Sequence, residues 1–242
     1  MQIKSLTLQN FRRYSNAVTI EFENLTAFVG KNDVGKSSIL EALDIFFNDG
    51  RGCIKLDKDD INKIEASCGN NEIAVCFESL PDTVVIDATN ETTLESEYLL
   101  NESRQLEIVK KYPNAGSAKV YIRAYHPTNP NCSDLLLKKD SDLRKILSSQ
   151  SIACEDQTRN AVMRKAIWER YSDDLQLETI DIDVTKSDAK TIWDKLQKYL
   201  PLYTLFQADR KNTDGDSEVQ DPLKEAVKEI LADESLAATL RS

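Results

Sequence analysis

Residues 30–38 read GKNDVGKSS, and this stretch decides the fold. It matches the pattern G-x-x-x-x-G-K-[ST], whose fixed positions are Gly30, Gly35, Lys36 and Ser37. The two glycines allow a tight backbone path along which successive N–H groups point inward at a phosphate. The lysine supplies a cation for the β- and γ-phosphates, and the serine hydroxyl can ligate Mg²⁺. The pattern therefore predicts a loop that cradles the phosphates of a nucleotide.

The residues on either side of this loop fit a strand before it and a helix after it. Residues 25–29 (LTAFV) form a short apolar run that is typical of a buried strand. Beyond the loop, apolar side chains recur at helical spacing: Ile39, Leu40, Leu43, Phe46 and Phe47. A helix there directs its positive N-terminal end at the same anion. The alternative, a loop whose glycines only make a turn, leaves the Lys-Ser pair at the helix start unexplained.

With these flanks, residues 1–47 resemble the N-terminal lobe of ABC-type ATPases of the SMC/RecF/OLD (overcoming lysogenisation defect) group. The resemblance is carried by an opening strand that ends in LQNFR (8–12), a second strand at 18–22, the loop in its G-x-N-x-x-G-K-S form, and the helix start SILEAL (38–43). Residues 202–221 are similar, more weakly, to OLD-like bacterial ATP-dependent endonucleases. The resemblance implies an α/β fold: an ABC-type P-loop NTPase lobe with an antiparallel β-meander, followed by a helical insert.

The resemblance also implies a nucleotide site that is larger than the loop. In this family the opening hairpin packs beside the base and ribose, so that Arg12 becomes a candidate phosphate contact. A surface pair formed by Arg12 and Arg13 is the alternative, and both interpretations stay open. Asn32 would lie near the γ-phosphate. The implied nucleotide-binding residues are Asn10, Phe11, Arg12, Gly30, Lys31, Asn32, Asp33, Val34, Gly35, Lys36, Ser37 and Ser38, with Asp33 and Val34 contributing only backbone amides.

A second candidate region follows the apolar run at residues 202–206. Gln207 resembles the family's Q-loop glutamine, which reaches Mg²⁺ and the attacking water, and it would share the metal with Ser37. The alternative is a glutamine that caps a strand end. Two neighbours, Asp209 and Arg210, could instead contact the nucleotide or a partner protomer. Three later carboxylates resemble a metal cluster, although a solvated acidic turn is the plainer interpretation: Asp214, Asp216 and Glu218.

The middle of the chain changes from strand patterns to helix patterns. Four segments are typical of strands and form the expected meander: 72–77, 83–86, 106–112 and 119–125. Three later segments are typical of helices: 135–147, 161–171 and 188–200. The last of them shows an apolar face that indicates core: Ile192, Trp193, Leu196, Tyr199 and Leu200. We expect an N-lobe at 1–130, a helical insert at 131–201, and a Q-loop-like strand with the start of a helical arm at 202–242.

Two parts of an ABC-type site have no counterpart in this sequence. There is no LSGGQ-like signature segment. Residues 84–87 (VVID) imitate a Walker B strand, but Ala88 stands where the catalytic glutamate belongs, so that a short apolar strand is the plainer interpretation. Residues 177–183 (LETIDID) alternate and match less well. In the family both parts lie in a C-terminal lobe beyond an arm like residues 221–240. The resemblance therefore implies half of an ATPase head, which alone binds ATP–Mg²⁺ weakly and hydrolyses it slowly or not at all.

The composition of the chain excludes several further classes of protein. A net charge of −10 opposes unaided nucleic-acid binding. Small basic pairs occur at 110–111, 138–139 and 164–165, and they indicate solvated faces rather than surfaces that bind nucleic-acid phosphates. Five scattered cysteines and a single histidine, His126, argue against a disulfide framework or zinc site. No apolar run approaches the roughly 18 residues of a membrane helix, and no secretory signal begins the sequence. We expect a cytoplasmic protein that uses ATP and Mg²⁺ and has no membrane partner.

Three hypotheses of function result. The first is an ATPase module whose ATP-driven head dimerisation controls DNA processing or an associated nuclease, in DNA repair or phage defence. It would act as a homodimer or higher oligomer, and DNA would be contacted only through the full-length assembly. The second is a nucleotide-dependent interaction subunit without hydrolysis, completed by a partner chain. The third, a small-molecule or nucleotide kinase, is opposed by the meander and by the opening hairpin.

Overall fold

The computed structural model describes residues 1–30, 35–49, 52–60, 70–87 and 90–205. The chain divides into two compact units. The first, here called the sheet unit, comprises Met1–Ala27 and Lys58–Pro201. The second, here called the P-loop unit, comprises Phe28–Asp57 and the chain from Leu202 onward.

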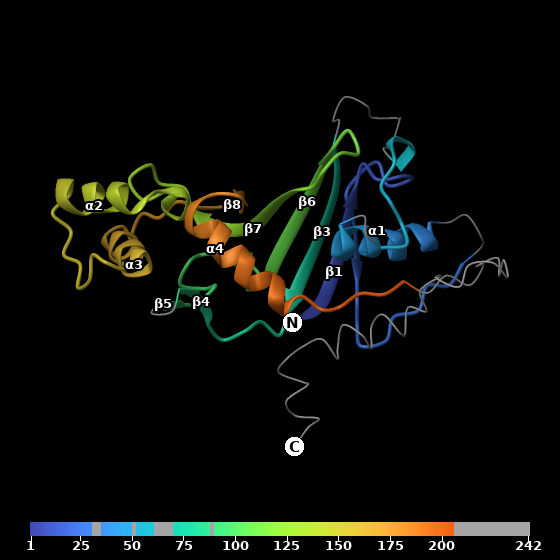
Figure 1. Ribbon diagram of the computed structural model, residues 1–242, viewed down its shortest axis with the longest axis horizontal. Helices are drawn as coiled ribbons and strands as arrows, with labels where there is room; N and C mark the ends of the chain where they lie inside the picture. Colours follow the sequence, from blue (N-terminus) through green and yellow to red (C-terminus); the bar gives the residue numbers. More distant parts are fainter. Residues whose placement is uncertain (31–34, 50–51, 61–69, 88–89, 206–242) are drawn as a thin grey trace, which may run out of the picture. The chain divides into compact units, whose positions relative to one another are not determined.

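A six-stranded antiparallel sheet forms the centre of the sheet unit (Figure 1). Its strand order is β2-β1-β3-β6-β7-β8. The strands are β1 (Gln2–Gln9), β2 (Val18–Glu21), β3 (Asn70–Glu78), β6 (Leu106–Pro113), β7 (Lys119–Pro127) and β8 (Leu177–Asp183). Among the described strands, β4 (Val84–Asp87) and β5 (Asn90–Thr92) pair only with each other. The predicted antiparallel meander is confirmed by β3, β6 and β7, which are consecutive neighbours, while the predicted strand near residues 83–86 forms a separate hairpin.

One face of this sheet is aliphatic, because alternate residues of a strand point to the same side. A single row of register partners crosses five strands and consists of Leu6, Val75, Ile108, Ile122 and Ile182. Each of these side chains is at most 4% exposed. Burying one such side chain contributes about 1.5–3 kcal/mol. This row is the centre of the core that positions the strands and the turns between them.

The opposite face of the sheet carries a network of ion pairs. Arg123 on β7 contacts Asp181 on β8 at 2.7 Å and Glu72 on β3 at 2.9 Å. Lys111 on β6 contacts Asp181 at 2.6 Å. Burial raises the pKa of Asp181, but hydrogen bonds from Arg123 and Lys111 outweigh it and hold that pKa below its ordinary value. The basic side chains on this face are therefore paired with acidic ones, so this face is poorly suited to binding the phosphates of a nucleic acid.

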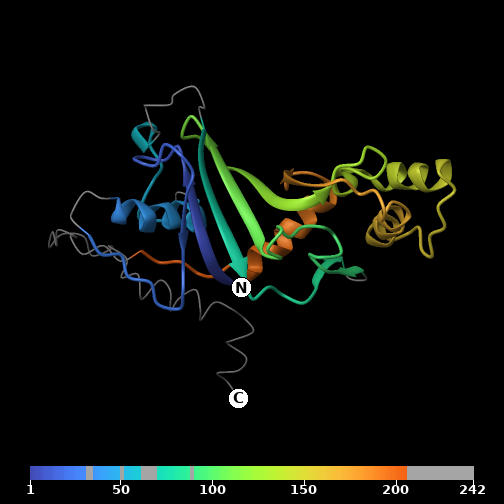
Figure 2. The same ribbon diagram turned by 180° about the vertical axis from the view of Figure 1, so that it is seen from behind.

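Helices α2 (Asp140–Ser149) and α3 (Asn160–Arg170) pack on each other beyond the β8 end of the sheet (Figures 1 and 2). The predicted helix at 135–147 is divided into the short η3 (Leu135–Leu137) and α2. The predicted helix at 188–200 becomes α4 (Ser187–Leu196) followed by η4 (Gln197–Tyr199). Because a 3₁₀ turn changes the angle between successive residues, Tyr199 leaves the apolar stripe and is 47% exposed. The predicted core face of this helix therefore ends at Leu196.

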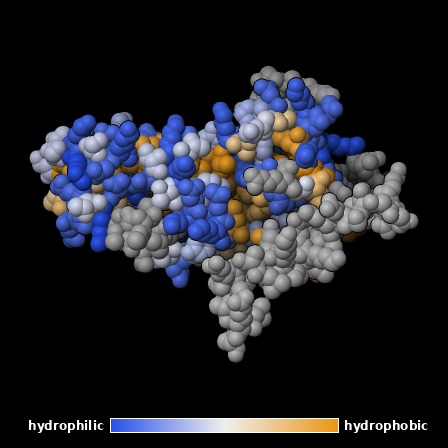
Figure 3. Space-filling view, in the orientation of Figure 1, coloured by the Kyte–Doolittle hydropathy of each residue, from blue (hydrophilic) through white to orange (hydrophobic). Residues whose placement is uncertain are grey.

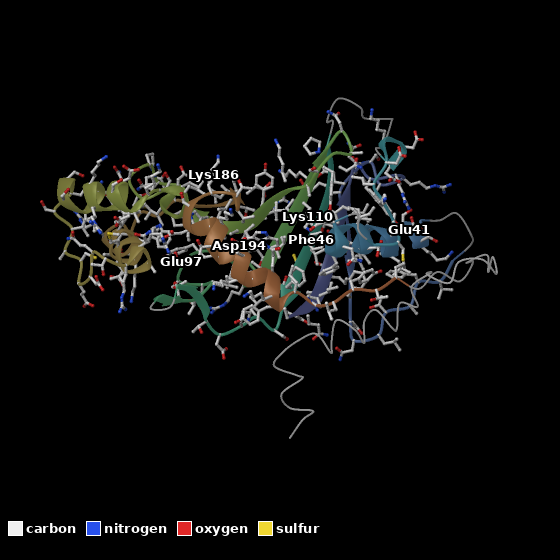
Figure 4. All side chains as sticks on the ribbon, viewed as in Figure 1. Glu41, Phe46, Glu97, Lys110, Lys186 and Asp194 are labelled. Atoms are coloured by element: carbon white, nitrogen blue, oxygen red, sulfur yellow. The ribbon has the colours of Figure 1, made fainter. Side chains whose placement is uncertain are left out.

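A buried arginine joins α3 to the rest of the sheet unit. Arg164 is fully buried, and its Nε and Nη2 donate to the Glu97 carboxylate at 2.7 and 2.8 Å. Its Nη1 pairs with Asp188 on α4. Glu97, labelled in Figure 4, lies beside α3 and is itself only 2% exposed. The prediction that the basic pairs are solvated is wrong for Arg164 and also for Lys110, which is 4% exposed on the aliphatic face of β6.

Two apolar runs that the sequence predicts to be buried strands form no strand within the described ranges. Leu25 and Val29 are 89% and 94% exposed, and Leu202 is 66% exposed, although Leu205 is buried. A strand requires hydrogen-bonded neighbours, and no described strand pairs with either run. Both predictions are wrong in this structure, whereas the mixed α/β class of the lobe is confirmed.

The surface of the helical insert is mainly hydrophilic on the face seen in Figure 3, where α2 and α3 lie. Among the helices that the structure describes, none is long and apolar enough to cross a bilayer.

Candidate nucleotide-binding site

The glycine loop closes through the side chain of Lys36, the first residue of α1 (Lys36–Asn48). The Lys36 Nζ donates to the carbonyl oxygen of Gly30 at 2.6 Å, so that the ammonium group spans the loop between its first and last residues. Gly35 has φ 95° and ψ 4°, a left-handed conformation that residues other than glycine adopt at a cost in free energy. Residues 31–34, which include the predicted contact Asn32, lie outside the described residues. The described ends of the loop have the backbone conformation and the cation that a phosphate cradle requires.

The N-terminal end of α1 has the chemistry of an anion site. No acidic residue occurs in its first turn. The first backbone N–H groups of a helix point out of its end, and the helix dipole adds positive potential there. Ser37 is exposed and Ser38 is half-buried. The ammonium of Lys36 and the exposed hydroxyl of Ser37 therefore fit a nucleotide phosphate and its Mg²⁺.

The far end of α1 is fixed by a buried carboxylate. Asp44 is 1% exposed and accepts hydrogen bonds from Ile54 N at 2.8 Å and from Asn48 Nδ2 at 2.9 Å. A Cβ at Gly52 would lie 2.5 Å from both Asp44 carboxylate oxygens, so only glycine allows this close approach. The chain after α1 therefore folds back onto the helix and holds it in place.

Residues 202–205 are attached along the same helix. The Tyr203 hydroxyl donates to Leu40 O at 2.8 Å, and its ring stacks on Phe47 with centroids 5.7 Å apart. Burial raises the pKa of this phenol. The Tyr203 carbonyl lies against Asn48, and the Leu205 carbonyl accepts from Cys53 Sγ at 3.7 Å. Residues 202–205 therefore run from the C-terminal end of α1 towards its N-terminal end (Figure 1).

The predicted contacts Asn10, Phe11 and Arg12 form a tight turn after β1 in the sheet unit. Phe11 is fully buried, and it exchanges two backbone hydrogen bonds with Tyr14, at 3.0 and 2.8 Å. Arg12 is held by Asp60, whose backbone carbonyl accepts from Arg12 N at 2.6 Å and whose Oδ1 accepts from Arg12 Nε at 2.7 Å. Arg13 is exposed. The two arginines are therefore not an equivalent surface pair, since Arg12 is anchored by a residue 48 positions away.

The two segments that imitate a Walker B strand belong to the sheet unit. Residues 84–87 form β4 of the separate hairpin, and residues 177–183 form the edge strand β8, so neither is a Walker B strand beside a P-loop strand. No group of three or more His, Cys, Asp or Glu within the described ranges could hold a metal ion. The remaining candidates lie outside the described residues: Gln207, Asp209, Arg210, Asp214, Asp216, Glu218 and the predicted helix at 221–240.

Three residues that sequence reasoning missed support these sites: Asp44, Asp60 and Tyr203. Asp60 and Tyr203 contact residues 48 and 163 positions away, so no local pattern could reveal them. Asp44 had a weak signal, because an acidic residue interrupts the apolar run Leu43–Phe46 of α1. All three act by holding a predicted site residue, or the helix that carries one, in place.

Comparison with known proteins identifies the family of this chain. One similar solved structure is described as "Structural biochemistry of ATP-driven dimerization and DNA stimulated activation of SMC ATPases"; it is 18% identical, with 61% of this chain and 91% of that chain covered and a TM-score of 0.35. Another is the SmcHead bound to the C-winged helix domain of ScpA, at 22% identity, with 50% of this chain and 35% of that chain covered and a TM-score of 0.36. No curated protein matches the sequence. Residues 1–241 match the family described as AAA ATPase domain, and because this match spans nearly all of the sequence, the chain belongs to that family.

Proposed function

We propose that this chain is the ATP-binding half of a cytoplasmic ATPase head of the SMC/RecF/OLD kind. In this proposal, ATP-driven pairing of heads controls DNA processing or an associated nuclease, in DNA repair or phage defence. The observation that carries the proposal is the contact of Lys36 Nζ with Gly30 O across a loop whose last residue, Gly35, is left-handed. Membership of the AAA ATPase domain family supports the same chemistry.

Each residue of the proposed site has one task. The backbone N–H groups of residues 30–38 hold the phosphates, and Lys36 neutralises their charge. Ser37 and Gln207 hold Mg²⁺, which when bound draws negative charge from the phosphate oxygens. The turn of Asn10, Phe11 and Arg12 contributes beside the base, ribose and phosphates, as the resemblance implies.

The path of residues 202–205 supports the assignment of Gln207. These residues lie along α1 and run towards its N-terminal end, where Ser37 stands. Tyr203 fixes this path through its hydrogen bond to Leu40 and its stacking on Phe47.

The exposure of apolar residues supports the proposal that the head is completed by a further lobe. Val29, directly before the loop, is 94% exposed, and Leu202 is 66% exposed. Apolar runs of this kind are typical of strands buried in a sheet, and strands from a second lobe would cover them. The signature and Walker B segments would come from that lobe, and hydrolysis of ATP would require it. Contact with DNA would likewise belong to the full-length assembly.

A second candidate function is favoured by the hairpin of β4 and β5. Because residues 84–87 pair with β5 and with no other described strand, they supply no Walker B strand. A nucleotide-dependent interaction subunit, which binds ATP without hydrolysing it, has no need of one. The two candidates differ in one measurement: an ATPase half gains ATP turnover when it is mixed with a completing lobe, whereas an interaction subunit does not.

The test is a calorimetric titration of the purified chain with Mg²⁺–ATP, with light scattering in the presence and absence of ATP. We expect weak binding that is lost in Lys36→Ala. Lys55→Ala is the matched control, because it removes an equal charge from an exposed position of the same unit outside the loop. An ATP-dependent increase in mass would support pairing of heads by this chain. Absence of binding, or equal binding by Lys36→Ala, would overturn the proposed function.

A further inference from the structure

Residues 202–205, here called the strap, are attached to one face of helix α1 through a single tyrosine. The Tyr203 hydroxyl donates to Leu40 O at 2.8 Å. Its ring stacks on Phe47, with centroids 5.7 Å apart and an interplanar angle of 18°, and its carbonyl accepts from Asn48 Nδ2 at 3.5 Å. Positions 40, 47 and 48 lie on one face of a helix, because their spacing is i, i+7, i+8. Tyr203 therefore holds about two turns of α1 along that face.

The same face of α1 begins with two residues of the candidate nucleotide site. Lys36 and Ser37 precede Leu40 by four and three positions, so they lie one helical turn before the carbonyl that Tyr203 contacts. The strap and α1 belong to the same compact unit. The contact made by Tyr203 is thus adjacent to the turn that carries the ammonium and the hydroxyl of the proposed phosphate site.

The N-terminal turn of α1 depends on contacts from outside the helix. Its N-cap, Gly35, has no side chain, and no side-chain hydrogen bond caps the first turn. The first bond of the helix, from Ile39 N to Gly35 O, is 3.3 Å long. A helix of 13 residues is marginal in isolation, and most of its stability comes from tertiary packing. Contacts such as that of Tyr203 therefore decide how well the first turn is ordered.

We propose that Tyr203 is a positioning residue for nucleotide binding: by holding Leu40 and Phe47, it keeps the first turn of α1 ordered before a phosphate arrives. A preordered site binds more tightly, because less conformational entropy is lost on binding. This inference rests on the proposed function, since it takes the loop with Lys36 as the phosphate site. A tyrosine with a purely structural role would change the stability of the chain but not the affinity of the folded chain for ATP.

The experiment compares variants of the full chain by calorimetric titration with Mg²⁺–ATP and by hydrogen exchange of residues 36–43 with and without nucleotide. Tyr203→Phe removes the hydroxyl and keeps the ring on Phe47, whereas Tyr203→Leu removes both. Tyr199→Phe is the matched control, because it removes the same hydroxyl from a side chain that is 47% exposed. Thermal unfolding of each variant reports on stability separately. If Tyr203→Leu does not fold, Tyr203→Phe carries the test.

We expect Tyr203→Phe to weaken ATP binding about two- to tenfold, the range for one intramolecular hydrogen bond, and Tyr203→Leu to weaken it further. Without nucleotide, the amides of residues 39–43 should exchange faster in Tyr203→Phe than in the unchanged chain. Saturating Mg²⁺–ATP should remove most of this difference, because the bound phosphate itself orders the turn. Tyr199→Phe should bind and exchange as the unchanged chain does.

A lower thermal stability of Tyr203→Phe with unchanged ATP affinity would assign Tyr203 a purely structural role and overturn the inference, as would tighter binding by this variant. If Lys36→Ala abolishes binding while Tyr203→Phe binds and exchanges as the unchanged chain does, the inference fails and the proposed function stands. If the unchanged chain does not bind ATP, both fail.

Discussion

At the scale of the residue, the two loop glycines are required for different reasons. Gly35 occupies φ 95°, where a Cβ meets the neighbouring backbone. Gly30 has no such backbone constraint, and a Cβ there would lie 3.9 Å from Lys36 Nζ, an ordinary contact. The motif treats the two positions alike, whereas the backbone separates a glycine needed for conformation from one that tolerates a side chain.

We therefore predict that Gly35→Ala lowers the free energy of unfolding by about 1–3 kcal/mol, the range for a strained backbone residue, and weakens ATP binding. Gly30→Ala should leave the stability nearly unchanged. Chemical denaturation followed by circular dichroism measures the first effect, and calorimetry the second. Equal destabilisation by both substitutions would contradict the role assigned to the left-handed conformation.

His126 gives a prediction for the dependence of stability on pH. It is 1% exposed, and its Nδ1 donates to Tyr98 O at 2.8 Å. Burial lowers the pKa of His126 below its ordinary 6.5. As the pH falls, the imidazole therefore takes up a proton in the unfolded chain at a higher pH than in the folded one. The stability that neutral His126 contributes is complete above pH 6.5. It is lost as the pH falls from 6.5 towards the lower pKa of the folded state. Denaturation midpoints measured between pH 7.5 and 5 should fall for the unchanged chain and less steeply for His126→Gln. Parallel curves for the two proteins would refute the assignment.

At the scale of the element, one side chain decides how the helical insert is attached. Arg164 on α3 joins Glu97, before the sheet strand β6, to Asp188 at the start of α4. The apolar residues of α2 and α3 indicate that both helices pack, but they do not identify the surface against which they pack. A buried charge between two carboxylates specifies that surface, because displacing α3 would leave the charges unpaired.

Removal of the Arg164 charge should therefore strongly destabilise the folded protein. We expect Arg164→Met to lower the free energy of unfolding by about 3–5 kcal/mol, since Glu97 would remain buried without its partner. The matched comparison is Arg104→Met, which breaks an exposed pair with Glu95 and should cost less than about 1 kcal/mol. Urea denaturation of both variants provides the measurement. Similar losses for the two would indicate that burial of the first pair has no energetic consequence.

At the scale of the whole molecule, we expect the protection of backbone amides from hydrogen exchange to differ along the chain. β3 and β6 each have hydrogen-bonded neighbours on both sides. Residues 25–30 and 202–205 pair with no described strand, and they expose Leu25, Val29 and Leu202. The sheet should thus be stable on its own, whereas the two apolar runs gain no stability from pairing with a described strand.

Hydrogen exchange followed by mass spectrometry tests this difference. Amides of β3 and β6 should exchange slowly, at rates set by global unfolding, and peptides covering 25–30 and 202–205 should exchange much faster. Addition of a completing lobe should slow the second group alone. Equal protection of all four segments in the isolated chain would show that the apolar runs are already paired in solution.

Much of this protein could be predicted from local patterns. Alternation located β3, β6 and β7, helical spacing located α1 and α3, and the glycine spacing located the loop, because each of these signals arises from a few consecutive residues. The same reasoning was wrong where the outcome depends on strand pairing or on the geometry of a helix end. Residues 25–29 have the composition of a strand but pair with no described strand. Tyr199 leaves the apolar stripe because the last turn of its helix tightens.

The sequence by itself determined the class of this protein: an α/β lobe of the AAA ATPase domain family, with a loop whose glycines, lysine and serine suit a nucleotide phosphate. Only the tertiary structure decided which residues hold those groups in place. Asp60 on Arg12, Tyr203 on Leu40 and Arg164 between Glu97 and Asp188 join positions 24 to 163 residues apart. No periodicity links such positions, because their contacts arise only when separate elements pack and each buried polar group must find a partner.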